Sequence, residues 1–490
     1  MIDILLFQPA IITREKISFG VISNGLIALG LYLKQKRLRV KICHFNGCTK
    51  TLGAFVQQKI LQYKPKSVGI NLTWHTHCYQ ALKIAEAVKS VNKNIKVCLG
   101  GFTASFFDKE ILDFVQQESI FKNINPYIDC IIRGDGEKPL FEFITKKRIP
   151  KANTSYIDKN GNFLRNPLAY TPKKLPSVRL KWELNKFIDN WQNYIQRGGI
   201  RTSVPGVENK VGHNVDKGEF HLYVGKGCRN NCCYCGGGRD VQKLLFRRNY
   251  PIFRQLNDVI YDINQLSKNN VKTVYIDFDP DPSRKYYKKL FKKINKQNLN
   301  LIFSAWSGPI ESNLLTEMDK IFNKVEIIIS SETGSERLRK ELLRRGFGKV
   351  PFYTNQQLVK FLEELKKKGF KAMVYFISGL PWETEKDWKE TIKFGKKLSK
   401  DYQMLFVKSY DTIITRNLCA PPLYIEPGSP IYTNPDKFQM CLSRKFFKDY
   451  VSNSRRPDPD SFLGVYRCKF GSEKNVINNT KKFKVVVINN

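Results

Sequence analysis

The chain has 490 residues, of which 42% are apolar and 26% are charged, a composition typical of a globular protein. This length exceeds what one hydrophobic core usually serves, so we expect two or three domains. No apolar run reaches the roughly 18–20 residues of a membrane-spanning helix, and Asp3 stands where a signal peptide requires Lys or Arg. These features argue against a membrane span and predict a cytoplasmic location.

The net charge of +39 comes from 83 Lys and Arg residues against 44 Asp and Glu residues. Such an excess would suit an acidic partner such as nucleic acid. However, the lysines are spread along the whole chain, and no nucleic-acid-binding motif accompanies them. The charge fits equally well a lysine-rich solvated surface of the kind that an AT-rich genome encodes. We therefore do not expect nucleic acid as a partner.

The first 150 residues alternate short apolar runs with helical patterns, of which residues 79–90 are the clearest. Five runs have the length of buried strands: residues 2–7, 40–43, 67–72, 96–99 and 130–132. Strands that alternate with helices form a parallel sheet. The sequence therefore predicts an α/β domain over residues 1–150 with a doubly wound, flavodoxin-like sheet.

The residues that follow these strands are candidate ligand contacts, because ligands of doubly wound sheets bind beyond the carboxyl ends of the strands. Glycines there let a ligand approach the backbone closely, although an ordinary tight turn has the same requirement. The candidates after the third, fourth and fifth strands are Thr73, Trp74, His75, Gly100, Gly101, Gly134, Gly136 and Glu137.

The periodicity breaks down over residues 151–217, where several prolines and the turn signal Asn160-Gly161 predict a linker. Alternation then returns, with a helix at residues 354–368 whose Thr354 and Gln357 can form a capping box. Strands are expected at residues 271–278, 299–305, 325–330 and 372–377. These units predict a partial or full (β/α) barrel over residues 218–414, followed by an irregular C-terminal region, residues 415–490, that would cover the active site.

Four of the twelve cysteines form one dense group, at positions 228, 232, 233 and 235. In a long intracellular chain such a group predicts a metal site rather than disulfide bonds. Cys228, Cys232 and Cys235 are separated by three and then two residues, directly after an expected strand. Three thiolates can hold three irons of a cubane cluster and leave the fourth iron open, whereas a fully ligated cluster uses four cysteines.

Two other metal sites fit the cysteine group less well. A structural zinc site needs a fourth Cys or His, and neither His213 nor His221 stands at a usual ligand spacing. Cys233 could extend a zinc motif, but adjacent cysteines rarely chelate one ion. A buried structural cluster does not suit the polar loop at residues 229–231. We therefore favour a 4Fe–4S cluster with one open iron.

The three cysteines, with the aromatic Tyr234 before the last of them, match the pattern CxxxCxΦC. In this pattern the chain resembles the radical S-adenosylmethionine (radical SAM) superfamily. The resemblance implies that the open iron binds the amino and carboxylate groups of SAM, and that an electron cleaves SAM to methionine and a 5′-deoxyadenosyl radical. It also implies an electron donor such as flavodoxin or ferredoxin as a partner.

Three later segments are similar to SAM-binding segments of this superfamily. Residues 277–280 stand where the family commonly has a Gly-Gly-Glu type of sequence, which this chain lacks. Residues 330–338 resemble the segment that reaches the ribose and carboxylate, although their Ser and Glu could instead cap a helix. Residues 375–384 resemble the segment beside the adenine. The resemblance implies SAM contacts for Tyr234, Asp277, Asp279, Ser331, Glu332, Ser378 and Gly379.

The N-terminal half is similar to the cobalamin-binding domain that precedes the radical SAM domain in one large subfamily, through residues 71–73, 98–103 and 131–137. The resemblance implies cobalamin as a cofactor, contacted by the eight candidates named above. Many cobalamin proteins carry a cobalt-ligating His after the first strand, but residues 8–14 contain none. Thr73, Trp74 or His75 would then face the cobalt.

Residues 421–435 resemble the C-terminal region of the same subfamily, nearest to its tryptophan C-methylating members of class B type. The leading hypothesis is therefore a cobalamin-dependent C-methyltransferase acting on an unactivated or aromatic carbon of a small molecule or peptide. One alternative is a cyclisation, ring contraction or oxidation without methyl transfer, and another is a protein that modifies or binds nucleic acid. No catalytic residue is assigned from the sequence.

Overall fold

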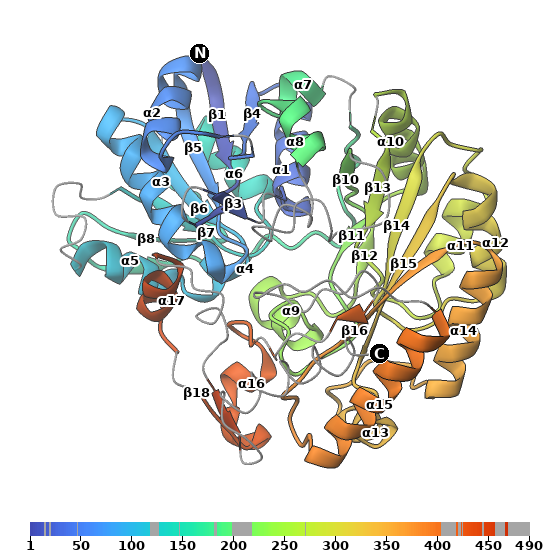
Figure 1. The fold of residues 1–490 in the computed structure, drawn as a ribbon. Helices are drawn as coiled ribbons and strands as arrows, with labels where there is room; N and C mark the ends of the chain where they lie inside the picture. Colours follow the sequence, from blue (N-terminus) through green and yellow to red (C-terminus); the bar gives the residue numbers. More distant parts are fainter. Residues whose placement is uncertain are drawn as a thin grey trace. The chain divides into compact units, whose positions relative to one another are not determined.

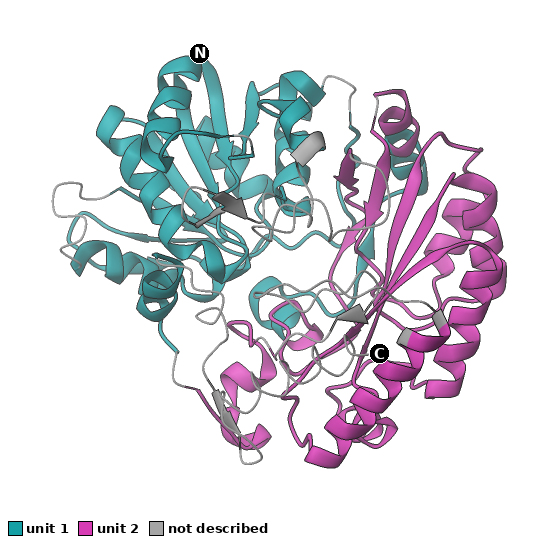
Figure 2. Cartoon of the chain, viewed as in Figure 1, with its two compact units in different colours: residues 1–203, 241–262, 445–458 teal, residues 204–240, 263–444, 459–490 magenta. Residues whose placement is uncertain are grey.

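The computed structural model of the chain describes residues 1–13, 16–18, 21–46, 48–117, 127–146, 148–180, 184–197, 218–269, 271–402, 418–419, 423, 425–442, 445–455 and 466–468. The chain forms two compact units (Figure 2). Unit 1 comprises residues 1–203, 241–262 and 445–458, and unit 2 comprises residues 204–240, 263–444 and 459–490. Each unit is built around its own sheet.

Unit 1 contains a seven-stranded sheet in the order β4-β1-β5-β6-β7-β8-β9. Its first five strands are parallel and reproduce the flavodoxin-like order predicted from the sequence. Their apolar residues are almost all buried, as two covered faces require. The strands are β1 (Ile2–Phe7), β4 (Val40–Cys43), β5 (Pro65–Asn71), β6 (Lys96–Gly100), β7 (Cys130–Ile132), β8 (Thr154–Ile157) and β9 (Phe163–Arg165).

Helices cover both faces of this sheet, with α2 packed on α3 and α1 beside α6 (Figure 1). Ser23 and Thr51 cap α1 and α2 through their side-chain oxygens. The helices of unit 1 are α1 (Asn24–Gln35), α2 (Leu52–Tyr63), α3 (Cys78–Val91), α4 (Phe102–Phe106), α5 (Asp108–Gln117), α6 (Glu137–Thr145), α7 (Leu184–Phe187), α8 (Trp191–Arg197) and the short η1 (His75–His77). A two-stranded ribbon, β2 (Ile11–Thr13) and β3 (Lys16–Ser18), follows β1.

Part of the predicted linker belongs to the first sheet. Strands β8 and β9 form an antiparallel hairpin that extends the sheet beyond β7. The predicted turn lies between them, where Gly161 has φ +82° and the Asp158 carboxylate accepts hydrogen bonds from the Asn160 and Asn162 amides. Both strands are too short to give a periodic signal, which is why the sequence predicts only the turn.

Unit 1 also contains a helix from near the end of the chain, α17 (Phe447–Arg455). The Ser454 hydroxyl accepts a hydrogen bond from the Tyr79 amide at 2.9 Å, and the Glu110 carboxylate accepts one from the Phe447 amide at 2.6 Å. Tyr450 packs against the Phe107 ring at 5.5 Å. These contacts join α17 to α3 and α5, so the C-terminal region is not a single irregular segment.

Unit 2 contains a parallel six-stranded sheet in the order β10-β13-β14-β15-β16-β17. Strands and helices alternate along the chain, so this is the partial (β/α) barrel predicted from the sequence. No pairing of β10 with β17 closes the sheet within the described residues. The strands are β10 (Glu219–His221), β13 (Thr273–Ile276), β14 (Asn300–Ala305), β15 (Val325–Glu332), β16 (Lys371–Phe376) and β17 (Leu418–Cys419).

Helices α11 to α15 of unit 2 line one side of this sheet (Figure 1). Thr354 and Gln357 form the predicted capping box at the start of α14. The helices are α11 (Lys285–Phe291), α12 (Ser312–Ile321), α13 (Glu336–Arg344), α14 (Asn355–Lys367), α15 (Glu385–Tyr402), α16 (Pro430–Thr433) and the short η4 (Pro435–Phe438). Helices α9 (Arg239–Phe246) and α10 (Leu256–Lys268) have residues in both units.

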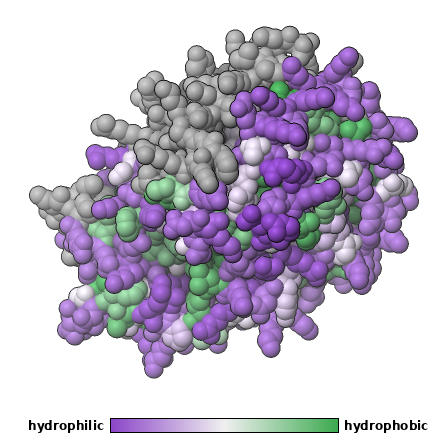
Figure 3. All heavy atoms as spheres, turned by 90° about the horizontal axis from the view of Figure 1, so that it is seen from below, coloured by the Kyte–Doolittle hydropathy of each residue, from purple (hydrophilic) through white to green (hydrophobic). Residues whose placement is uncertain are grey.

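Four short strands complete the structure: β11 (Gly225–Lys226), β12 (Ile252–Phe253), and the antiparallel pair β18 (Met440–Leu442) and β19 (Tyr466–Cys468). The face shown in Figure 3 is mostly hydrophilic, with apolar residues scattered in small groups. None of the helices in the described part of the chain is long and apolar enough to cross a membrane.

Candidate functional site

The three predicted cluster cysteines lie on one loop that follows β10 in unit 2. Cys232 is buried, whereas Cys228 and Cys235 are partly exposed. The Cys235 amide donates a hydrogen bond to the Cys232 carbonyl at 3.1 Å, and the Gly237 amide donates one to the Cys235 sulfur at 3.3 Å. The loop thus turns tightly and brings a backbone donor to a sulfur, as in protein sites that hold iron–sulfur clusters.

The arrangement of the cysteines suits a cluster better than a single ion. Within the described residues, no group of three or more His, Cys, Asp or Glu side chains is close enough to hold one metal ion. A tetrahedral zinc site needs four ligands around one ion, whereas each cysteine of a cubane binds a separate iron. The three cysteines lie on one tight loop, as the ligands of separate irons in one cubane can. The three residues present therefore fit a 4Fe–4S cluster.

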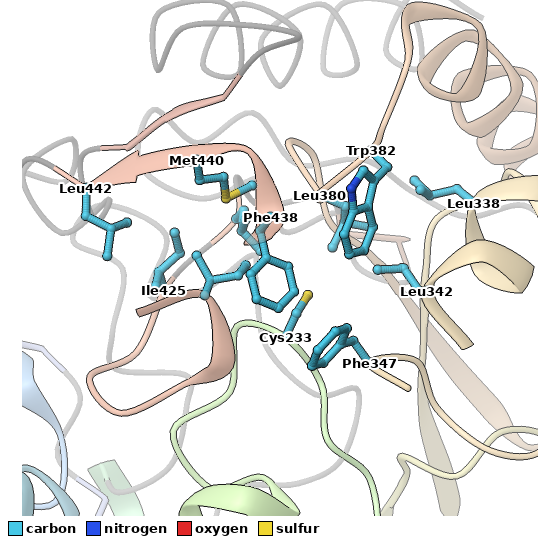
Figure 4. Close-up of a cluster of buried hydrophobic side chains, with 12 residues drawn as sticks. Cys233, Leu338, Leu342, Phe347, Leu380, Trp382, Ile425, Phe438, Met440 and Leu442 are labelled. Carbon is cyan, nitrogen blue, oxygen red and sulfur yellow. The ribbon is translucent and has the colours of Figure 1, made fainter. Parts of the chain in front are cut away.

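Cys233 points away from this space. Its side chain lies in a cluster of buried apolar residues of unit 2 that includes Phe347, Trp382 and Phe438 (Figure 4). Its carbonyl accepts a hydrogen bond from the Ile431 amide at 2.9 Å. The adjacent cysteine therefore packs as an apolar residue and anchors the loop, so it is not placed to extend a zinc motif.

The histidines considered for zinc are also elsewhere. His213 lies outside the described residues. His221 lies on β10, with Nε2 2.9 Å from Glu219 Oε1 and Nδ1 3.6 Å from Asp277 Oδ2. Burial lowers the pKa of His221, but the two carboxylates more than offset this and raise the pKa to about 9. A protonated imidazole cannot coordinate a metal ion, so His221 holds the two strands together instead.

Tyr234, the aromatic residue of the cysteine motif, connects the loop to the end of β15. Its hydroxyl donates a hydrogen bond to Glu332 Oε1 at 2.6 Å. The same oxygen lies 3.5 Å from the Nζ atom of Lys349, which also donates a hydrogen bond to the Ser330 carbonyl at 3.2 Å. All three side chains are largely buried, so the ammonium and the tyrosine hydroxyl together stabilise the carboxylate.

The end of β15 has an unusual backbone conformation. Glu332 has φ +64°, in the left-handed region that side chains other than glycine rarely adopt, and the register of β15 with β16 shifts there. Such a conformation costs on the order of 1–3 kcal/mol and is concentrated at functional sites. The neighbouring Ser331 hydroxyl accepts a hydrogen bond from Tyr353 at 3.1 Å. The two predicted SAM contacts on this strand are therefore held in fixed positions.

The two aspartates after β13 have different surroundings. Asp279 is buried and forms two hydrogen bonds with Arg284, at 3.1 and 2.9 Å, while the Ser307 amide donates to Asp279 Oδ2 at 2.9 Å. Both of its oxygens are therefore already engaged. The Asp277 side chain is 36% exposed and has His221 beside it. Of the two residues, Asp277 is the better placed to bind a ligand amine.

Ser378 and Gly379 follow β16. The Ser378 carbonyl accepts a hydrogen bond from the Leu423 amide at 2.7 Å, and Gly379 has φ +84°. The Gly379 amide donates to Glu383 Oε2 at 2.6 Å. Burial raises the pKa of Glu383 to about 8, because the Gly379 and Leu380 amides only partly offset the loss of solvent. Glu383 thus fixes the turn in which both predicted SAM contacts lie.

A segment from the C-terminal region contacts the cysteine loop within unit 2. The Glu426 carboxylate accepts a hydrogen bond from the Gly236 amide at 2.5 Å, and the Glu426 amide donates to the Tyr234 carbonyl at 3.0 Å. A Cβ at Gly236 would lie 2.9 Å from the Pro427 carbonyl oxygen, so only glycine fits there. Residues 425–442 therefore help to hold the loop in place.

The ammonium of Lys349 acts on all three predicted cluster cysteines. Burial raises the pKa of the Cys228, Cys232 and Cys235 thiols, and the ammonium of Lys349 opposes that change at each of them. Cysteines must lose their protons to bind iron. A buried positive charge beside them therefore favours the thiolate forms that a cluster requires.

In unit 1, the predicted cobalamin contacts after β5 are held by neighbouring loops. The Thr73 hydroxyl donates a hydrogen bond to Asn71 Oδ1 at 2.8 Å, and the Thr73 carbonyl accepts one from Thr103 at 2.8 Å. Thr73 and Trp74 are partly exposed. His75 is buried with its ring 5.0 Å from that of Tyr450, and burial lowers its pKa to about 3. His75 is thus a packed neutral histidine, and the two residues before it lie nearer the surface.

The glycines predicted to contact cobalamin are also needed by the fold. Gly101 has φ +118°, and a Cβ there would lie 2.7 Å from the Leu72 carbonyl carbon. A Cβ at Gly134 would lie 3.0 Å from the Leu245 carbonyl oxygen, and one at Gly136 would lie 3.3 Å from Leu29. Gly100 has more room, since the nearest atom to a Cβ there would be the Ile132 carbonyl oxygen at 3.4 Å. Glu137 begins α6, where a carboxylate suits the helix dipole.

Lys349, Glu426 and His221 contribute to this site but were not predicted from the sequence as site residues. Lys349 is one of many lysines and has no motif around it. Glu426 meets Gly236 across 190 positions of the chain, a separation that leaves no local pattern. The sequence indicates an alternating segment that begins at His221, but not that two carboxylates meet its imidazole.

Comparison with known proteins supports this description of unit 2. Residues 222–395 match the model of the Radical SAM superfamily. The chain is 23% identical over 361 residues to an uncharacterized methyltransferase of Pyrococcus horikoshii, and the alignment covers 70% of this chain and 66% of that protein. It is 22% identical over 360 residues to the anaerobic magnesium-protoporphyrin IX monomethyl ester cyclase of Rubrivivax gelatinosus. That alignment covers 71% of this chain and 57% of the cyclase. The chain thus spans less than two thirds of the length of each relative.

The fold is similar to that of TsrM from Kitasatospora setae, a radical SAM methyltransferase. The similarity to TsrM with cobalamin and a 4Fe–4S cluster bound has a TM-score of 0.62 and 16% identity, and covers 88% of this chain and 77% of TsrM. The similarity to TsrM with tryptophan and a SAM analogue bound has a TM-score of 0.61 and 16% identity, and it covers 81% of this chain and 71% of TsrM. The match to the Radical SAM superfamily includes the cysteine loop and most of the parallel sheet of unit 2, so this part of the chain is a radical SAM domain.

Proposed function

We propose that the chain is a cobalamin-dependent radical SAM methyltransferase that transfers a methyl group to carbon. The single observation that carries the proposal is the loop with Cys228, Cys232 and Cys235, since a radical SAM domain implies a 4Fe–4S cluster and SAM. The methyltransferase assignment is supported by the similarity to the Pyrococcus horikoshii relative and to the TsrM fold. The substrate is proposed to be a small molecule or a peptide.

In this proposal the residues of unit 2 bind and orient SAM. Bound there, the cluster and SAM supply the electron transfer and the activated methyl-bearing sulfonium that the reaction needs. Asp277 would bind the amine of SAM, because its carboxylate is partly exposed and is fixed in place beside His221. Ser331 and Glu332 would position the ribose and the carboxylate, and the turn at Gly379 would leave room for the adenine.

Cobalamin is proposed to bind at the carboxyl edge of the sheet of unit 1. The support is the flavodoxin-like strand order and the linked loops after β5, β6 and β7, since ligands of such sheets bind at this edge. No His follows β1, and the ring of His75 is packed on Tyr450. We therefore expect no protein imidazole on the cobalt, with Thr73 and Trp74 as the residues that face it.

The second candidate function is a radical cyclisation, ring contraction or oxidation without methyl transfer. The similarity to the Rubrivivax gelatinosus cyclase, which covers 71% of this chain, is the observation that favours this second candidate. Anaerobic incubation of the reconstituted enzyme with SAM, a reductant and small-molecule or peptide extracts distinguishes the two. The proposal expects a product that has gained one methyl group, together with S-adenosylhomocysteine. A product of unchanged carbon count, with 5′-deoxyadenosine alone, would support the second candidate.

A nucleic-acid modifier is the third hypothesis, motivated by the net charge of +39. If this charge serves binding, affinity for polyanions should persist at physiological salt and nucleic acid should be consumed as substrate. Release from polyanions at moderate salt, with no effect of nucleic acid on turnover, would leave the charge as a property of the surface alone.

An electron donor such as flavodoxin or ferredoxin is proposed as a partner, because reductive cleavage of SAM needs one electron at a time. A chemical reductant can replace it in the assays above. A faster turnover with reduced flavodoxin than with the chemical reductant alone would support this partner.

A further inference from the structure

The buried ammonium of Lys349 belongs to a segment that packs against the cysteine loop, where the Val350 amide donates a hydrogen bond to Asn230 Oδ1 at 3.3 Å. Its side chain is 13% exposed, its Nζ atom lies 3.5 Å from Glu332 Oε1, and it donates a hydrogen bond to the Ser330 carbonyl at 3.2 Å. The same atom lies 5.5 Å from the centre of the Trp306 ring. These contacts fix the charge beside Glu332, whose carboxylate also accepts the hydrogen bond from Tyr234 of the cysteine loop.

A buried lysine is costly unless its charge is compensated. Burial alone lowers the pKa of Lys349, but the Glu332 carboxylate and the Cys232 thiol more than offset burial and leave the pKa above its ordinary value. The site therefore contains a permanent positive charge. Glu332 Oε1, 3.5 Å from the ammonium, compensates that charge in part.

We propose that Lys349 is a positioning residue whose charge sets the reduction potential of the iron–sulfur cluster. This inference rests on the proposed function, which supplies the cluster. A cluster held by thiolates becomes more negative when it accepts an electron, and its potential depends on the charges and hydrogen bonds around it. A cation fixed beside the cysteine loop stabilises the reduced state and raises the potential. Glu332 acts in the opposite direction.

The test is a redox titration of the reconstituted full-length protein, without SAM, followed by electron paramagnetic resonance of the reduced cluster. The variants are Lys349→Met, which removes the charge at similar length, and Lys349→Arg, which keeps it. We expect the ratio of reduced to oxidised cluster at a fixed potential to fall roughly tenfold in Lys349→Met, about 59 mV for one electron. Lys349→Arg should stay near the wild type.

Two further variants separate charge from packing. Lys367→Met removes an exposed lysine at the end of α14 and should leave the potential unchanged. Glu332→Gln removes the opposing charge while keeping an oxygen that Tyr234 can donate to, so the potential should rise. If Lys349→Met does not fold, the opposite shift in Glu332→Gln still tests the electrostatic account.

Three results would overturn the inference: an unchanged potential in Lys349→Met, equal shifts in Lys349→Met and Lys349→Arg, or a lower potential in Glu332→Gln. A wild-type protein that holds no cluster under anaerobic reconstitution would instead refute the proposed function, and this inference with it. The iron content of each sample, measured first, tells these two failures apart.

Discussion

The Tyr234 hydroxyl donates a hydrogen bond to Glu332 across 98 positions of the chain, at 2.6 Å. It joins the aromatic position of the cysteine motif to the strained end of β15, where Glu332 has φ +64°. Because the acceptor is a buried carboxylate, this bond is of the charge-assisted kind. The two ends of the proposed SAM site are therefore coupled through one side-chain contact.

The Tyr234→Phe variant should keep the ring and lose this bond. We expect the free energy of unfolding of unit 2 to fall by about 1.5–3 kcal/mol, because a buried charged acceptor loses one of its donors. Iron binding should persist, since none of the cysteines changes. Urea denaturation and iron analysis measure the two effects. An unchanged free energy of unfolding in Tyr234→Phe would contradict the prediction.

The cysteine variants test the ligand assignment. Cys228→Ala, Cys232→Ala and Cys235→Ala should each lose the cluster, because each removes the ligand of one iron. Cys233→Ala should retain it and lower the free energy of unfolding by only ~1 kcal/mol, since its side chain packs in an apolar cluster. Iron and sulfide analysis after anaerobic reconstitution decides between them. Loss of the cluster in Cys233→Ala would show that the ligands are misassigned.

Gly100 and Gly101 of unit 1 should respond differently to substitution, although the sequence alone predicts the same loss of cobalamin for both. Bulky residues at Gly100 or Gly101 are expected to block cobalamin, but Gly101 also packs on the Leu72 backbone with φ +118°. Gly101→Ala should therefore destabilise unit 1 by about 1–3 kcal/mol or more. Gly100→Leu should fold and lose cobalamin, measured by its absorbance. Gly53→Ala, with open space around it, is the control. Normal cobalamin content in Gly100→Leu would argue against this binding edge.

The histidines predict opposite pH responses of the two units. Burial lowers the pKa of His75 and His77 to about 3 and that of His44 to about 4, so the unfolded chain binds more protons than unit 1 below the ordinary value of 6.5. Lowering the pH from about 6.5 to about 5.5 should then cost unit 1 up to ~1.4 kcal/mol for each histidine.

In unit 2 the sign is reversed. The pKa of His221 is raised to about 9, so its contribution is fully present below 6.5 and is lost as the pH rises through about 9. Hydrogen exchange resolved by peptide, corrected for the intrinsic rate at each pH, measures the stability of each unit. Parallel responses of the two units would contradict the assignment of these charges.

Much of the fold could be predicted from the sequence, because strongly apolar strands and periodic helices depend on local patterns. The five-stranded parallel core of unit 1 and the capping box at Thr354 are of this kind. The hairpin of β8 and β9 could not be predicted, since strands of four and three residues have no measurable period. Helix α17 joins unit 1 through contacts with residues more than 300 positions away, which no local pattern encodes.

The site was predictable where chemistry requires a fixed spacing. Cys228, Cys232 and Cys235 are the proposed ligands of separate irons and lie on one loop, so their spacing is visible in the sequence. Asp279 is also expected to contact SAM, because it follows an expected strand, but its carboxylate forms a buried ion pair with Arg284. Lys349 and Glu426 meet the loop only in three dimensions, so their contacts depend on packing rather than on sequence pattern.

The most direct test of the central proposal is the fate of SAM in one anaerobic experiment. The reconstituted enzyme is incubated with SAM and reductant, with and without cobalamin, and the products are measured by mass spectrometry. The proposed methyltransferase should form S-adenosylhomocysteine only when cobalamin is present, and Cys228→Ala, Cys232→Ala and Cys235→Ala serve as cluster-free controls. Formation of 5′-deoxyadenosine and methionine alone, at the same rate with and without cobalamin, would contradict it.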